Sequence, residues 1–242
     1  MFVRRLFDVR NLLGVAAAVL IANAGIAQEA EGFSGRAGLG FISTKGNSES
    51  ESTNANFDFW LNYGKWNHSL SGTAISADTS GENTAEAYGL GWQSKYNFTD
   101  TDYAFGLIAW DKDQFSSFDQ QFRQVAGYGR RILNSEAHYL AGEIGVGARQ
   151  SELSDGTDQD EFIGYLGGEY RWAISENAAF SQLLSVETGA DNTYVEATSS
   201  LSSNIRESLA LVIAFTFKNN SDVLVDTDNT DTITTISLEY GF

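Results

Sequence analysis

The last eleven residues, TITTISLEYGF from Thr232 to Phe242, decide the fold. Thr234, Ile236, Leu238, Tyr240 and Phe242 alternate with Thr, Ser, Glu and Gly. Successive side chains of a strand point to opposite faces, so this stretch predicts a strand with one apolar face. A strand of about ten residues crosses a bilayer at a tilt, and in lipid only a closed barrel satisfies the backbone hydrogen bonds of its strands. The pattern predicts the final strand of a transmembrane β-barrel.

The first residues indicate export. Arg4, Arg5 and Arg10 precede an apolar run from Leu12 to Ala27, and small residues precede Gln28. This pattern is typical of a cleaved signal peptide, so we assign residues 1–27 to the signal peptide and 28–242 to a single barrel domain. The alternative, a membrane anchor, is less favoured because the run is short for a bilayer span.

The composition favours strands. The chain has no Pro, although average usage of about 5 % would give around a dozen. Pro is excluded from central strands, whereas the abundant Gly and aromatic residues suit bent strands and interfacial girdles. No run after residue 27 approaches the roughly 20 apolar residues of a membrane helix. With no Cys, stability must come from backbone pairing and burial.

The mature chain repeats one unit, a strand of about a dozen residues followed alternately by a short turn and a longer polar loop. An even number of strands, short periplasmic turns and long outer loops are typical of bacterial outer-membrane barrels. We therefore expect an all-β, antiparallel, up-and-down barrel with both chain ends on the periplasmic side. The twelve predicted strands are 32–44, 52–63, 65–77, 84–98, 102–115, 119–133, 136–150, 160–174, 177–190, 193–206, 208–219 and 230–242.

Alternation assigns the two faces of these strands. Phe57, Leu90 and Ile213 are expected to face outward, and their neighbours Asp58, Gly91 and Ala214 to face the lumen. Gln124 and Ser203 interrupt the outward apolar face on two strands. A soluble β-sandwich with an inward apolar face is the alternative fold.

Several motifs resemble one known family. WDKDQFSSFDQQFR (110–123), GKWNHSL (64–70), TAEAYG (84–89), the Gly46–Asn47 loop and the closing DTITTISLEYGF are similar to the YdiY-like salt-induced outer-membrane proteins, domain of unknown function 481. The resemblance covers nearly the whole mature chain. It implies an outer-membrane barrel of Gram-negative bacteria and supplies no catalytic residues.

An outer-membrane hydrolase would need a His beside a Ser or Asp. The chain has two histidines, His68 and His138, and each follows a short turn, so both are expected at the periplasmic rim. Neither belongs to a recognisable catalytic motif. We therefore expect no enzymatic activity, no catalytic residue and no cofactor.

The lumen carries the more informative charges. In a narrow barrel, opposite charges on neighbouring strands can pair and fill the interior. Such a network would occlude the lumen; alternatively, the same side chains would line a narrow, selective channel for ions or small solutes. Alternation places ten charged residues inside: Arg123, Arg131, Glu143, Arg149, Glu169, Arg171, Glu187, Glu196, Lys218 and Glu239.

The chain is strongly acidic, with a formal net charge of −17, which argues against nucleic-acid partners. Outer-membrane lipid and lipopolysaccharide are the expected surroundings, and Leu238, Tyr240 and Phe242 resemble the C-terminal signal read by the barrel assembly machinery. The acidic loops near Glu152–Glu161 and Asp222–Asp231 are interpreted as solvated surfaces, with divalent cations as the alternative partners. No metal-binding loop motif is complete, so no metal ligand is assigned. The sequence thus predicts an envelope-integrity or salt-stress barrel with an occluded lumen, or a narrow channel.

Overall fold

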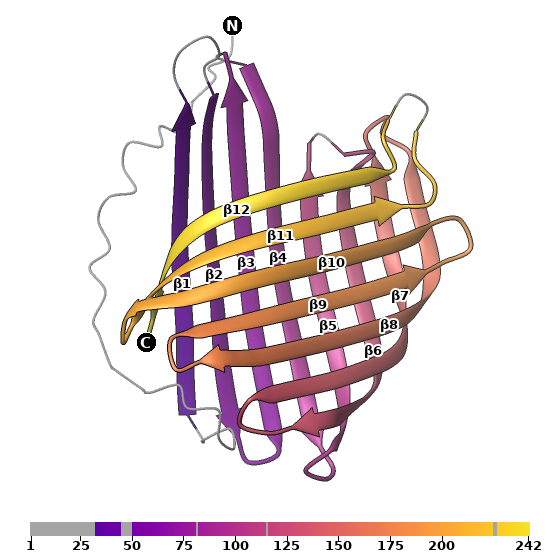
Figure 1. Cartoon of the computed structure of the whole chain (residues 1–242). Helices are drawn as coiled ribbons and strands as arrows, with labels where there is room; N and C mark the ends of the chain where they lie inside the picture. Colours follow the sequence, from indigo (N-terminus) through magenta and orange to yellow (C-terminus); the bar gives the residue numbers. More distant parts are fainter. Residues whose placement is uncertain (1–31, 45–49, 81, 115, 225–226) are drawn as a thin grey trace, which may run out of the picture.

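The computed structural model describes residues 32–44, 50–80, 82–114, 116–224 and 227–242. The predicted signal peptide lies outside these residues. Each strand pairs with the next in antiparallel order, and β1 also pairs with β12, which closes a barrel (Figure 1). The strands are β1 (Gly32–Thr44), β2 (Ser50–Tyr63), β3 (Trp66–Thr79), β4 (Glu82–Asn97), β5 (Asp102–Asp113), β6 (Phe118–Asn134), β7 (His138–Leu153), β8 (Asp158–Ser175), β9 (Ala178–Thr188), β10 (Thr193–Arg206), β11 (Leu209–Asn220) and β12 (Thr230–Gly241).

The prediction of a twelve-stranded antiparallel barrel is confirmed. Predicted and observed strands agree most closely at 32–44 and 193–206, whose bounds are those of β1 and β10. The largest differences lie around the β7–β8 connection, where pairing continues to Glu152 opposite Asp158. Strand ends that project past a bilayer need no apolar face, so the alternation that marks a membrane strand stops before the pairing does.

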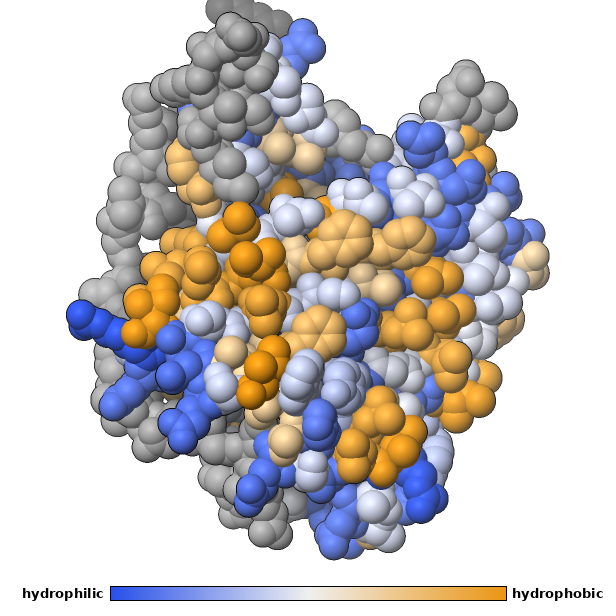
Figure 2. Space-filling view, viewed as in Figure 1, coloured by the Kyte–Doolittle hydropathy of each residue, from blue (hydrophilic) through white to orange (hydrophobic). Residues whose placement is uncertain are grey.

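The barrel wall has one apolar side. Residues directly opposite in neighbouring strands share a face, and Leu238 lies opposite both Leu211 and Leu39. Large apolar side chains on this face are exposed, up to 90 % for Phe162. Figure 2 shows hydrophobic side chains concentrated in the middle of the face in view, with hydrophilic ones gathered toward its edges. This outward apolar band is the surface that a lipid-embedded barrel requires.

Aromatic side chains gather at the mouth that holds the C-terminus, here called the C-terminal mouth. The ring of Phe242 lies 5.9 Å from that of Phe59 and 6.1 Å from that of Phe33, measured between centroids. Farther round the barrel, the rings of Trp66 and Tyr96 lie 4.9 Å apart. Aromatic girdles of this kind occupy the membrane–water interface of outer-membrane barrels.

The connections at the C-terminal mouth are short, and the β2–β3 turn places Gly64 at a φ of +57°, in the left-handed region that glycine tolerates best. The connections at the opposite mouth include the longest one of the barrel, between β11 and β12. Among the described residues, no helix is long and apolar enough to cross a membrane.

Candidate functional site

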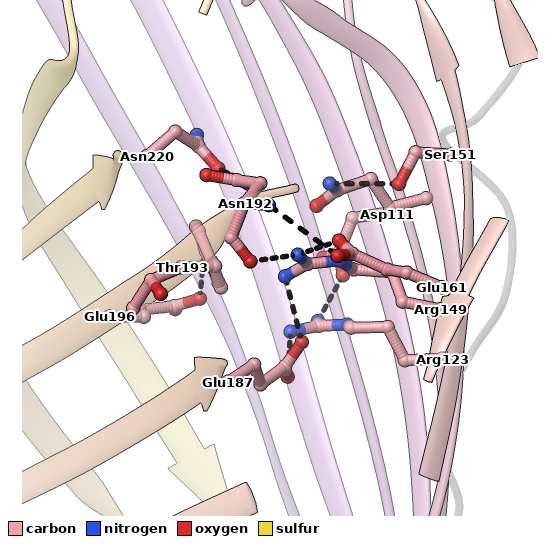
Figure 3. Close-up of polar contacts among 12 residues, drawn as sticks. Asp111, Arg123, Arg149, Ser151, Glu161, Glu187, Asn192, Thr193, Glu196 and Asn220 are labelled. Atoms are coloured by element: carbon pink, nitrogen blue, oxygen red, sulfur yellow. Dashed lines mark hydrogen bonds and ion pairs between the residues drawn. The ribbon is translucent and has the colours of Figure 1, made fainter. Parts of the chain in front are cut away.

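The inward face of β5 to β9 holds the most deeply buried charges. Arg123 on β6 and Arg149 on β7 lie directly opposite each other, which alone would be repulsive. Glu187 on β9 separates them: its carboxylate accepts hydrogen bonds from Arg123 at 2.8 Å and from Arg149 at 3.4 Å (Figure 3). Asp111 on β5 accepts a hydrogen bond from the other terminal nitrogen of Arg123, Nη2. Four strands are thereby joined across the lumen side of the wall.

Arg149 is the hub of this network, and its side chain is 0 % exposed. Besides Glu187, its guanidinium pairs with Glu161 and donates to the backbone carbonyl of Asn192 at 2.8 Å. Glu161 in turn accepts the backbone N–H of Asp191 at 3.1 Å. A buried arginine needs its charge and its donors matched, and each of the three guanidinium nitrogens of Arg149 has an acceptor here. The network thus ties the β9–β10 connection to the wall.

Further hydrogen bonds join the connections at the mouth opposite the C-terminal one. The side-chain amide of Asn192 donates to Asn220 at 2.8 Å, and the backbone N–H of Asp222 donates back to Asn192 at 3.2 Å. Ser117 on the β5–β6 connection accepts from the backbone of Leu224 at 3.3 Å through its hydroxyl, and from the backbone of residue 154 at 2.9 Å through its carbonyl. Four successive connections therefore contact one another, and we call them the loop cluster.

A second charged group lies nearer the C-terminal mouth. Lys95 on β4 pairs with Glu143 on β7 at 3.0 Å, and the hydroxyl of Tyr103 donates to the same carboxylate at 2.9 Å. The guanidinium of Arg131 lies 5.0 Å from the centre of the Tyr103 ring. A cation over an aromatic face is attracted by the ring, so Tyr103 connects Arg131 to Glu143.

An apolar cluster separates the two charged groups, a feature that the sequence did not predict. It consists of Tyr103, Phe105, Val125 and Ile163, with Leu107 and Tyr165 packed against it. Glycines on the neighbouring strand make room for the rings. A Cβ added at Gly129 would lie 2.3 Å from Tyr103 ring carbons. The lumen side of β5 to β8 is therefore filled by packed side chains.

The other charged residues predicted to face the lumen are dispersed. Glu169 pairs with Arg171 at 3.1 Å, and Glu239 lies 3.6 Å from Arg36. Glu196 accepts the hydroxyl of Tyr194 at 2.6 Å. Lys218 lies in register with Glu196 and Asp231, yet it forms no ion pair with any residue that the structure describes.

Five further charged residues form ion pairs inside the barrel but were not included in the predicted lumen charge network: Arg36, Asp58, Lys95, Asp111 and Glu161. Alternation assigns Asp58 and Lys95 to the inward face of their strands, and the observed register agrees. Glu161 was assigned to a solvated acidic loop instead. Glu161 lies within the predicted strand 160–174, and its position on β8, opposite Arg149 on β7, places its carboxylate inside the barrel.

A cavity of about 320 Å³ remains on the other side of the lumen. Its floor on β3 and β4 is made by small residues, including Ser71, Thr73, Gly89 and Gly91. The facing walls carry Lys95, Asp111, Arg123, Glu143, Glu169, Glu187 and Glu196, together with Leu107, Tyr165 and Leu183. The Nε atom of Arg123, one of these lining residues, is buried and has no hydrogen-bond partner among the described residues.

Both histidines lie on the outer face near the C-terminal mouth, within the aromatic girdle. The His68 ring stacks on Trp66 at 5.8 Å and on Trp92 at 6.1 Å. His138 stacks on Trp172, and its Nδ1 lies 3.0 Å from the hydroxyl of Tyr170. The hydrogen bonds of their rings in the described structure include none to a Ser or Asp side chain.

The acidic connections between β7 and β8 and between β11 and β12 were considered as sites for divalent cations. Within the described ranges, no three His or acidic side chains come together closely enough to hold a metal ion. In the β7–β8 connection, hydrogen bonds from the side chain and backbone of Thr157 hold the pKa of Asp155 below its usual range. That carboxylate is satisfied within its own turn.

Comparison with known proteins places the chain in a family. Residues 37–242 match the model described as "Protein of unknown function, DUF481". The chain belongs to this family. It is 33 % identical over 212 residues to the uncharacterized protein YdiY of Escherichia coli K12, across 86 % of this chain and 83 % of the relative. The resemblance noted from the motifs is therefore confirmed.

Solved structures share the fold at low identity. The translocator domain of the autotransporter NalP from Neisseria meningitidis superposes with a TM-score of 0.53 at 10 % identity, covering 90 % of each chain. The NanC porin has a TM-score of 0.48 at 10 % identity, covering 87 % of this chain and 98 % of the porin. At this low identity, the similarity to the NalP domain supports the barrel fold and says nothing about function.

Proposed function

We propose that this DUF481 protein is a non-catalytic barrel of the outer membrane of a Gram-negative bacterium, exported by the signal peptide at residues 1–27. The exposed apolar wall and the aromatic girdle support this location, with outer-membrane lipid and lipopolysaccharide as surroundings. The C-terminal mouth then faces the periplasm and the loop cluster faces outward. Leu238, Tyr240 and Phe242 lie on the lipid side of the last strand, where the barrel assembly machinery would read them.

We further propose that the lumen is occluded and that the protein contributes to envelope integrity under salt stress. The observation that carries the occlusion is the buried hub at Arg149, which ties the lumen wall to the β9–β10 connection and so to the loop cluster. A charged group held by that many partners is rigid, because any movement would leave a buried charge unmatched. The salt-stress role is what the family resemblance implies.

Planar-bilayer recording of the refolded protein tests the occlusion. The unmodified barrel is expected to be nearly silent, and the Arg149→Ala variant to admit ions. A steady open conductance in the unmodified protein would instead favour the second candidate, a narrow selective channel. The cavity of about 320 Å³ along β3 and β4 is the observation in favour of that candidate. Survival of a deletion strain at high salt tests the physiological role separately.

A further inference from the structure

The lumen cavity has an unbalanced charge. Its lining includes five carboxylates, from Asp111, Glu143, Glu169, Glu187 and Glu196, but only two cations, Lys95 and Arg123. A confined space with low-dielectric walls concentrates the field of such an excess. The cavity therefore favours a positively charged occupant over a negative one.

The two cations are already engaged by three of these carboxylates. Lys95 pairs with Glu143, and Arg123 pairs with Glu187 and Asp111. The carboxylates left over are Glu169 and Glu196. Glu169 pairs with Arg171, whose side chain is half-exposed. Glu196 accepts a hydrogen bond from the neutral hydroxyl of Tyr194 and forms no ion pair within the described part of the chain. These two are the groups available to an occupant.

The same part of the cavity has an apolar surface. Leu183 faces the lumen from β9, directly opposite Glu169 on β8 and Thr198 on β10, and 49 % of its surface is exposed. Leu107 and Tyr165 line the cavity as well. An exposed leucine inside a barrel contacts water unless an apolar group covers it, which is unfavourable in proportion to the area. An inorganic cation would leave Leu183 uncovered.

We propose that this cavity is a binding site for a small organic cation, in which an ammonium group lies between Glu169 and Glu196 and a short apolar body covers Leu183. A volume of about 320 Å³ accepts a molecule of this size. The inference does not depend on whether the lumen conducts, since a compartment closed at one mouth can still bind a solute.

Two probes of the same shape and opposite charge test the proposal. The barrel in nanodiscs of zwitterionic lipid is titrated with 3-methylbutylammonium and, separately, with 3-methylbutanoate, and binding is followed by saturation-transfer NMR. Empty nanodiscs report partition into the bilayer. Saturable binding of the ammonium and little binding of the carboxylate are expected. Equal binding of the two probes, or no binding of either, would overturn the proposal.

Variants locate the site. Glu196→Gln and Glu169→Gln should each weaken ammonium binding about tenfold, the effect of losing one charge-assisted contact. Leu183→Ser should weaken it as well, and Asp231→Asn, a lumen carboxylate outside the cavity, should leave it unchanged. Heat-modifiable gel mobility shows that each variant is folded. Binding unaffected by the glutamate changes would also reject the site. Because binding is measured without current, the result is independent of the occlusion test.

Discussion

Replacement of Arg149 by Met should destabilise the barrel more than any other single loss of a lumen charge. The side chain is 0 % exposed, and its partners Glu161 and Glu187 are 2 % and 1 % exposed. Removing one member of a buried ion pair costs about 3–5 kcal/mol, mostly because the other charge stays buried and unmatched. We expect a loss of this size for Arg149→Met, because Glu187 would still be paired with Arg123, whereas Glu161 would keep only the backbone N–H groups of residues 191 and 192.

The measurement is urea unfolding from lipid vesicles, followed by tryptophan fluorescence. The matched control is Arg130→Met: Arg130 pairs with Asp102 at 3.4 Å but is 62 % exposed, so its loss should cost below about 1 kcal/mol. The double variant Arg149→Met with Glu161→Gln removes the stranded charge and keeps an acceptor for the backbone, so it should recover part of the loss. A cost for Arg149→Met no larger than the control, or no recovery in the double variant, would refute the reasoning.

Three further predictions concern assembly, the two faces and the lumen packing. Replacing Tyr240 and Phe242 by Ser should lower the yield of the heat-modifiable, inserted form, because the last strand loses its outward aromatics and the packing of Phe242 on Phe59; normal insertion would contradict this. Arg in place of Leu90 or Ile213 should lower the free energy of unfolding by about 2–4 kcal/mol if the site meets lipid at the bilayer midplane. Single cysteines at Leu90 and Gly91 should also differ in labelling by a water-soluble thiol reagent, because they lie on opposite faces. Labelling that does not alternate between odd and even positions would exclude the assigned register. Gly129→Val should destabilise by about 1–3 kcal/mol because its Cβ would overlap the Tyr103 ring, whereas Gly168→Ala, with open space around its Cβ, should be nearly neutral in the same unfolding assay; equal effects would argue against the packing described.

The fold could be predicted because a membrane strand has a strict period of two. Leu90 on β4 and Ile213 on β11 were assigned to the outward face from that alternation alone. The observed register places both on the outward face of the barrel. The period says nothing about how far a strand continues beyond the bilayer. Glu161 lies near the start of the predicted strand 160–174, and its charge led to its being counted with the neighbouring acidic loop.

The partners within the lumen could be predicted only in part. Alternation places Arg123, Arg149 and Glu187 inside, but it does not give the stagger between strands that brings Glu187 between the two arginines. The apolar cluster was missed for a related reason. Val125 and Ile163 are apolar residues on the inward face, and a pattern that reads apolar as outward cannot assign them.

The junction of β1 and β12 joins the two ends of the chain by a short ladder. It pairs Arg36–Leu39 with Leu238–Gly241 and is extended by reciprocal backbone hydrogen bonds between Gly35 and Phe242. The β1–β2 ladder, by comparison, runs from Gly32 opposite Asn62 to Thr44 opposite Ser50. The other ladders join strands that follow each other in the chain, but this junction joins the first strand to the last and cannot form before β12 is present. The barrel thus remains an open sheet until β12 meets β1, and its shortest ladder is the place where thermal opening should begin.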